Sequence, residues 1–128
     1  ASETTNRPSV TLAPMIADAK AAFALIRSRA KEWNVDPEKV GMIGFSAGAM
    51  LTLSTTLYAP ETKPAFIGNV YGPLSAVKAP ADAPPLFIAL AADDPFFANA
   101  GFGLIESWKS VKKPVEFHLY EQGGHGFG

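Results

Sequence analysis

Apolar residues recur at three- and four-residue steps between Pro14 and Asn34. This spacing places them on one face of a helix, with most charged side chains on the other face. Pro14 suits the first helical turn, and Asn34 is expected to end the helix. The face expected to be buried consists of Ile16, Ala19, Phe23, Ile26, Ala30 and Trp33.

The rest of the chain alternates between short apolar runs and longer segments of helical periodicity. The short runs at 39–43, 65–71, 86–91 and 115–120 predict strands, and the segments at 47–58 and 102–112 predict helices. Strands that alternate with helices favour a parallel sheet with right-handed crossovers. We therefore predict one α/β domain over residues 1–128, with a short, mostly parallel sheet and helices on both faces.

Composition narrows the classes of function that remain. A chain of 128 residues that is 48% hydrophobic and 18% charged is typical of one globular domain rather than a disordered segment. A net charge of −1 gives no sign of a nucleic-acid partner or of an anionic membrane surface. The absence of cysteine excludes disulfides, thiolate metal sites and a cysteine nucleophile, and two histidines without metal-ligand spacing argue against a zinc site. No apolar stretch is long enough to span a bilayer.

The most informative motif is Gly44-x-Ser46-x-Gly48, between a predicted strand and a predicted helix. This context is that of a nucleophile elbow, in which a serine at a sharp turn holds strained backbone angles beside neighbours that lack bulk. The turn also aims the first free N–H groups of the helix, that of Ala47 included, at a developing oxyanion. The motif alone is weak evidence, since an ordinary glycine-rich turn can contain an incidental serine.

Candidate partners of Ser46 follow two of the later predicted strands. The pair Asp93-Asp94 comes directly after 86–91, and His125 follows 115–120 within a glycine-rich loop. The carboxyl ends of parallel strands share one edge of a sheet, so these side chains are expected near Ser46. His125 would take the serine proton, and an acid would orient its imidazole. His118 is a weaker candidate, because it lies inside the last strand and is expected to be half-exposed.

Four segments of the chain resemble the esterase branch of the α/β-hydrolases, in particular acetyl-xylan esterase-like and dienelactone-hydrolase-like enzymes. They are 33–40, Gly44-Phe45-Ser46-Ala47-Gly48, Ala91-Ala92-Asp93-Asp94-Pro95 and Gly123-Gly124-His125-Gly126-Phe127. The order serine, acid, histidine is also that of α/β-hydrolases. The resemblance implies a triad of Ser46, Asp94 and His125, because Asp94 stands at the family position before Pro95. Asp93 would then cap its loop.

The resemblance covers only the C-terminal half of such an enzyme. Members of the family carry further N-terminal strands beside the elbow strand, a loop that donates a second oxyanion N–H, and a helix after the histidine. We therefore expect a reduced α/β-hydrolase fold, with 40–45 at an open edge of the sheet and with Ala47 as the one identifiable oxyanion donor. The start at Ala1 fits either a removed leader or a fragment.

The predicted function is that of a serine esterase, which hydrolyses short-chain carboxylic esters through an acyl-enzyme and needs no cofactor or metal. The expected partners are a small-molecule ester, with acylated carbohydrate as one candidate, and a second copy of the chain recruited at the open edge, which would make a homo-oligomer. Phe96, Phe97, Tyr71 and Leu74 are candidates for a substrate pocket or for ordinary core packing. The alternatives are a non-catalytic hydrolase fragment with an incomplete oxyanion hole, and a serine peptidase or thioesterase on the same fold.

Overall fold

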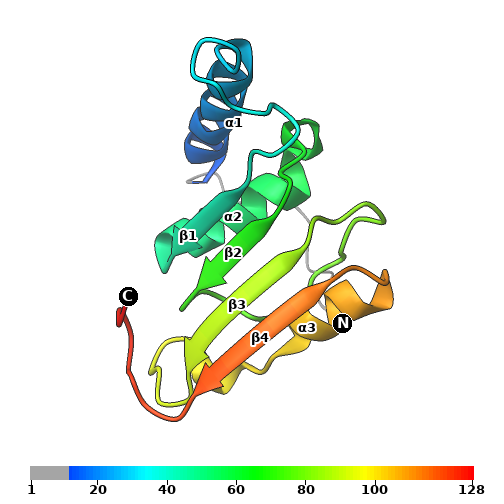
Figure 1. The fold of residues 1–128 in the computed structure, drawn as a ribbon. Helices are drawn as coiled ribbons and strands as arrows, with labels where there is room; N and C mark the ends of the chain where they lie inside the picture. Colours follow the sequence, from blue (N-terminus) through cyan, green and yellow to red (C-terminus); the bar gives the residue numbers. More distant parts are fainter. Residues whose placement is uncertain (1–11) are drawn as a thin grey trace.

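The computed structural model describes residues 12–128 of the chain (Figure 1). Its elements are α1 (Ala13–Ser28), β1 (Met42–Phe45), α2 (Ala47–Tyr58), the short 3₁₀ helix η1 (Pro60–Thr62), β2 (Ile67–Val70), β3 (Leu86–Ala91), the 3₁₀ helix η2 (Ala98–Ala100), α3 (Gly103–Ser110) and β4 (Val115–Tyr120). The four strands form one parallel sheet in the order β1-β2-β3-β4. The predicted α/β class and parallel sheet are confirmed.

The first helix is shorter than the sequence predicts. α1 ends at Ser28, and turns follow as far as Asn34, which has a left-handed φ of 55°. The N–H of Val35 bonds to the carbonyl of Ala30 at 2.8 Å and closes these turns. Because helical spacing no longer applies beyond Ser28, Trp33 does not reach the buried face and stays 44% exposed.

One face of the sheet carries the hydrophobic core. The core combines side chains from β2 and β3 with side chains from α2 and α3, so both helices cover the same face. The residues of this core include Leu53, Ile67, Leu86, Ile88, Leu90, Leu104 and Trp108. Trp108 is fully buried, and its indole N–H donates to the carbonyl of Pro84 at 2.7 Å, which joins α3 to the loop before β3.

Neither α2 nor α3 covers the other face of the sheet, which differs from the expected helices on both faces. Ile43, Phe45, Phe87 and Tyr120 lie there and are between 39% and 55% exposed. Successive strands are added in one direction, and right-handed crossovers then place α2 and α3 on the same side, behind the sheet in Figure 1. Helices on the second face would require the strand order to reverse.

β1 lies at an edge of the sheet, as predicted for 40–45. Within residues 12–128 it pairs with β2 alone. The N–H groups of Met42 and Ser46 bond to the carbonyls of Phe66 and Val70, so the alternate residues Ile43 and Phe45 turn their backbone polar groups away from β2.

Candidate active site

Ser46 occupies the sharp turn between β1 and α2. Its φ of 55° and ψ of −114° lie outside the ordinary regions for a side-chain-bearing residue, and its N–H donates to the carbonyl of Val70 at 3.0 Å. A Cβ on Gly44 would overlap the carbonyl of Gly48, so glycine is required at position 44. A Cβ on Gly48 would meet open space. The steric need that the sequence suggested for both glycines applies to the first one only.

A continuous hydrogen-bonded chain joins three of the predicted site residues. Ser46 Oγ lies 2.8 Å from His125 Nε2, and His125 Nδ1 lies 2.9 Å from Asp94 Oδ2. The three residues follow the carboxyl ends of β1, β3 and β4, which point to one edge of the sheet (Figure 1). With the Nδ1 proton facing the carboxylate, Nε2 is free to accept the hydroxyl proton. The arrangement can therefore activate a serine oxygen.

The carboxylate of Asp94 is buried and fully hydrogen-bonded. One of its oxygens meets His125, and the other accepts the N–H groups of Phe96 at 2.8 Å and Phe97 at 3.1 Å. Burial acts to raise the pKa of Asp94, but the bond from His125 and the two backbone N–H donors outweigh it and lower this pKa below its ordinary value. Asp94 is therefore ionised at neutral pH and can stabilise an imidazolium.

Asp93 points away from its own turn. Its Oδ1 accepts the N–H of Gly124 at 2.7 Å, on the loop that carries His125. The predicted capping of the 93–97 turn is done instead by Asp94, through the N–H groups of Phe96 and Phe97. Neighbouring side chains on a turn leave in different directions, and the sequence does not show which of the two reaches the His125 ring and which the backbone of its loop.

His118 stays outside this hydrogen-bonded chain. It lies within β4, its side chain is 45% exposed, and its Nε2 lies 2.9 Å from Glu116 Oε2. This agrees with the half-exposed strand position that the sequence predicted.

Aromatic rings surround the imidazole of His125. The ring centroids of Phe96, Tyr71 and Phe97 lie 4.8, 5.1 and 5.7 Å from that of His125. Phe96 is 68% exposed, whereas Leu74 is 1% exposed and belongs to the core. Three of the four proposed pocket residues thus lie at the site, and Leu74 does not.

Sequence reasoning missed Asn69 and gave no role to the ring of Phe127. Asn69 is buried in β2; its Oδ1 accepts the N–H of Gly72 at 3.1 Å, and its Nδ2 donates to the carbonyl of Pro73 at 2.9 Å. These bonds hold the turn on which Tyr71 has a left-handed φ of 36°, and Phe127 packs edge-on against the Tyr71 ring at 5.1 Å. An asparagine within an apolar run before Gly-Pro was the available signal.

The oxyanion donor that the sequence assigns lies at the start of α2. Ala47 is the first residue of this helix, and its N–H finds no backbone acceptor among residues 12–128. Such a free N–H beside Ser46 suits a developing negative charge.

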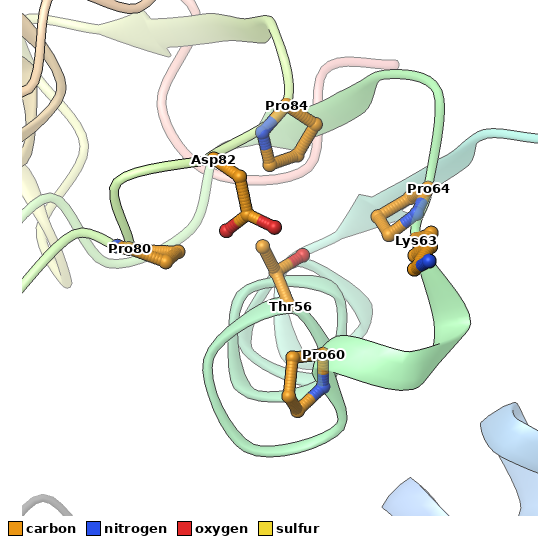
Figure 2. Close-up of a pocket in the computed structure, with 7 residues that line it drawn as sticks. All are labelled: Thr56, Pro60, Lys63, Pro64, Pro80, Asp82 and Pro84. Atoms are coloured by element: carbon orange, nitrogen blue, oxygen red, sulfur yellow. The ribbon is translucent and has the colours of Figure 1, made fainter.

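A separate hollow of about 240 Å³ lies at the amino ends of β2 and β3, the end of the sheet opposite to Ser46. Figure 2 shows the carboxylate of Asp82 directed across it toward Thr56. The residues that line it are Thr56, Pro60, Lys63, Pro64, Pro80, Asp82 and Pro84. Neither a histidine nor a serine lies among these residues.

Residues 12–128 contain no group of three or more His, Asp or Glu side chains that could hold a metal ion. None of the helices in this part has the length and hydrophobicity needed to cross a membrane.

Comparison with known proteins finds similar chains among the hydrolases. Over 52 residues, 40% of this chain and 11% of the relative, the sequence is 38% identical to an acetylxylan esterase of Xylanibacter ruminicola. An α/β hydrolase from a Medee basin deep-sea metagenome library is 27% identical with a TM-score of 0.74, over 87% of this chain and 50% of its own.

Two further solved structures share the fold at lower identity. A sugar hydrolase of Lactococcus lactis has a TM-score of 0.82 at 23% identity, over 96% of this chain and 59% of its own. An acetyl ester-xyloside bifunctional hydrolase of Caldicellulosiruptor lactoaceticus has a TM-score of 0.75 at 23% identity, over 88% of this chain and 57% of its own.

The chain thus spans half to three-fifths of the length of these solved neighbours. The model of the dienelactone hydrolase family matches residues 6–128, nearly the whole sequence. On this match, and with the fold and the elbow turn in agreement, the chain belongs to the dienelactone hydrolase family.

Proposed function

We propose that this chain is a serine esterase that hydrolyses short-chain carboxylic esters through an acyl-enzyme. The observation that carries the proposal is the hydrogen-bonded chain from Ser46 through His125 to Asp94, with distances of 2.8 and 2.9 Å. A serine hydroxyl is a weak nucleophile until a neighbouring base accepts its proton, and His125 is within reach to do so.

The reaction would proceed in two halves. Ser46 Oγ attacks the ester carbonyl carbon while its proton passes to His125 Nε2, and the carbonyl oxygen takes negative charge near the N–H of Ala47. Collapse of this intermediate breaks the bond to the alcohol, which leaves with the proton from His125. Water, deprotonated by His125, then attacks the acyl-serine, and His125 passes that proton to Ser46 Oγ as the bond to the serine breaks and the acid is released. Asp94 holds the imidazole and balances its charge in both halves.

The surroundings of His125 and the names of similar proteins support the proposed substrate class. Rings of Tyr71, Phe96 and Phe97 border the imidazole and favour a small apolar acyl group. The names of two similar proteins, an acetylxylan esterase and an acetyl ester-xyloside hydrolase, support an acetylated carbohydrate as the substrate.

A panel of chromogenic esters of increasing acyl length tests the proposal. We expect turnover that is highest for acetyl and propionyl esters and that disappears in Ser46→Ala, together with labelling of Ser46 by a fluorophosphonate. Hydrolysis by Ser46→Ala at the wild-type rate would contradict the assignment of the nucleophile. Labelling without turnover would indicate a non-catalytic relative, and a preference for thioesters or peptides in the same panel would replace the ester assignment.

A further inference from the structure

The loop that carries His125 has few attachments of its own. Among residues 12–128, no backbone–backbone hydrogen bond reaches the segment 121–128 after β4. Gly123, Gly124 and Gly126 adopt φ values of 152°, 63° and 81°, which suit glycine and leave the segment without bulky side chains on either side of His125. Interactions other than backbone–backbone hydrogen bonds of this segment must therefore set the position and orientation of the His125 imidazole.

The carboxylate of Asp93 supplies a backbone attachment at the residue before the histidine. Its Oδ1 accepts the N–H of Gly124 at 2.7 Å, a charge-assisted bond across 31 positions of the sequence. The neighbouring carboxylate, Asp94, holds the side chain of His125 itself at 2.9 Å. Two consecutive acids on one turn thus hold two consecutive residues of the other loop, one by its backbone and one by its ring.

The turn that bears both acids is itself rigid. Asp94 Oδ1 accepts the N–H groups of Phe96 and Phe97, and the N–H of Asp94 bonds to the carbonyl of Ala91 at 3.1 Å. Just before this turn, the N–H of Ala92 bonds to the carbonyl of Tyr120 at 2.7 Å, at the end of β4. The loop of His125 is therefore anchored at its start by Tyr120 and at its centre by Asp93.

We propose that Asp93 is a positioning residue of the esterase site, which holds the loop 121–128 so that His125 Nε2 stays within reach of Ser46. This inference rests on the proposed function only where it predicts an effect on kcat. The position of the His125 ring can be observed without any turnover. The feature of Asp93 that holds the loop is the oxygen that accepts the N–H of Gly124. A neutral side chain of the same shape with such an oxygen should therefore keep His125 in place, and a side chain without one should not.

The variants Asp93→Ala, Asp93→Asn and Asp94→Asn separate these roles. Asp93→Ala is expected to lower kcat by about tenfold to hundredfold with little change in KM, because a displacement of about 1 Å at a reacting group has that effect. Asp93→Asn keeps an acceptor of about half the strength and should stay within about threefold of the wild type. Asp94→Asn should lower kcat by roughly 10³–10⁴-fold, because the imidazole loses its tautomer.

The imidazole N–H resonance of His125 gives a readout that does not depend on turnover. We expect a protected Nδ1 proton in the wild type and in Asp93→Asn, a broadened or exchanging one in Asp93→Ala, and none in Asp94→Asn. His118, the other histidine of the chain, serves as the internal reference and should be unchanged in all variants. Thermal unfolding checks that each variant is folded, and the two Asp93 variants should be, because Asp93 is exposed.

Two results would overturn the proposal. One is an Asp93→Ala variant with wild-type kcat and an intact His125 resonance. The other is an Asp93→Asn variant as impaired as Asp93→Ala, which would assign the effect to the charge of Asp93 rather than to its acceptor oxygen. If the wild type hydrolyses no ester, the esterase proposal fails while the resonance still decides the role of Asp93.

Discussion

At the scale of single residues, the two oxygens of Asp94 have separate tasks. One holds the imidazole of His125, and the other closes the turn through Phe96 and Phe97. Each oxygen is a better acceptor when the carboxyl is ionised, so the folded state stabilises the carboxylate against the cost of burial. The geometry of the proposed triad and the stability of the fold thus depend on one charge.

This coupling predicts a pH dependence of stability. The pKa of Asp94 is lower in the folded chain than in the unfolded chain, where it is about 3.9. Its contribution is therefore fully present above pH 5 and is lost as the pH falls through about 4 toward the lowered folded value. The difference in free energy of unfolding between wild type and Asp94→Asn should shrink as the pH falls from 5 to below 4. Urea unfolding across this range measures it, and a difference that persists unchanged to pH 2 would contradict the expectation.

At the scale of elements, the junction of β1 and α2 decides where the serine hydroxyl lies. The strand must turn within one residue, and this brings Gly44 against the backbone of the first helical turn. Gly48 lies in the same turn with open space around its Cα. Two glycines that look equivalent in the motif thus differ in what they contribute to the structure.

We therefore predict opposite effects of alanine at these two glycines. Gly44→Ala should lower the free energy of unfolding by about 1–3 kcal/mol, because the new methyl group must displace the backbone of α2. Gly48→Ala should leave it unchanged or raise it by up to about 1 kcal/mol, since alanine is the better helix former. Denaturant unfolding of both variants compares them directly. Equal losses of stability would show that the turn needs both glycines.

At the scale of the whole molecule, the outer edge of β1 and the part of the sheet face beside it lack cover among the described residues. Ile43 and Phe45 combine both features, because their side chains lie on the exposed face and their backbone polar groups turn away from β2. Unpaired edge strands recruit other strands, and apolar patches of this kind favour association.

We predict that the chain self-associates through the edge of β1 and the exposed face beside it. Sedimentation at micromolar concentration should show a dimer, and Ile43→Lys should convert it to a monomer because a charge on an edge strand opposes pairing. Leu25→Lys is the matched control, since Leu25 is similarly exposed but lies on α1. A monomeric wild type would contradict the prediction, and so would a dimer that Ile43→Lys leaves intact.

The sequence by itself determined those features that depend on neighbouring residues. Helical periodicity placed α2, a continuous apolar run placed β3, and an alternating run placed β4 at their observed bounds. The motif around Ser46 and the positions of Asp94 and His125 after strand ends predicted a common site, because parallel strands bring their carboxyl ends to one edge.

Only the tertiary structure decided the features that depend on distant partners. The strand order placed α2 and α3 on one face, and no local pattern encodes that order. The early end of α1 exposed Trp33, although its spacing matched the buried stripe. The separate tasks of Asp93 and Asp94 depend on the direction in which each side chain leaves the turn, which is set by the loop that packs against it 31 residues later.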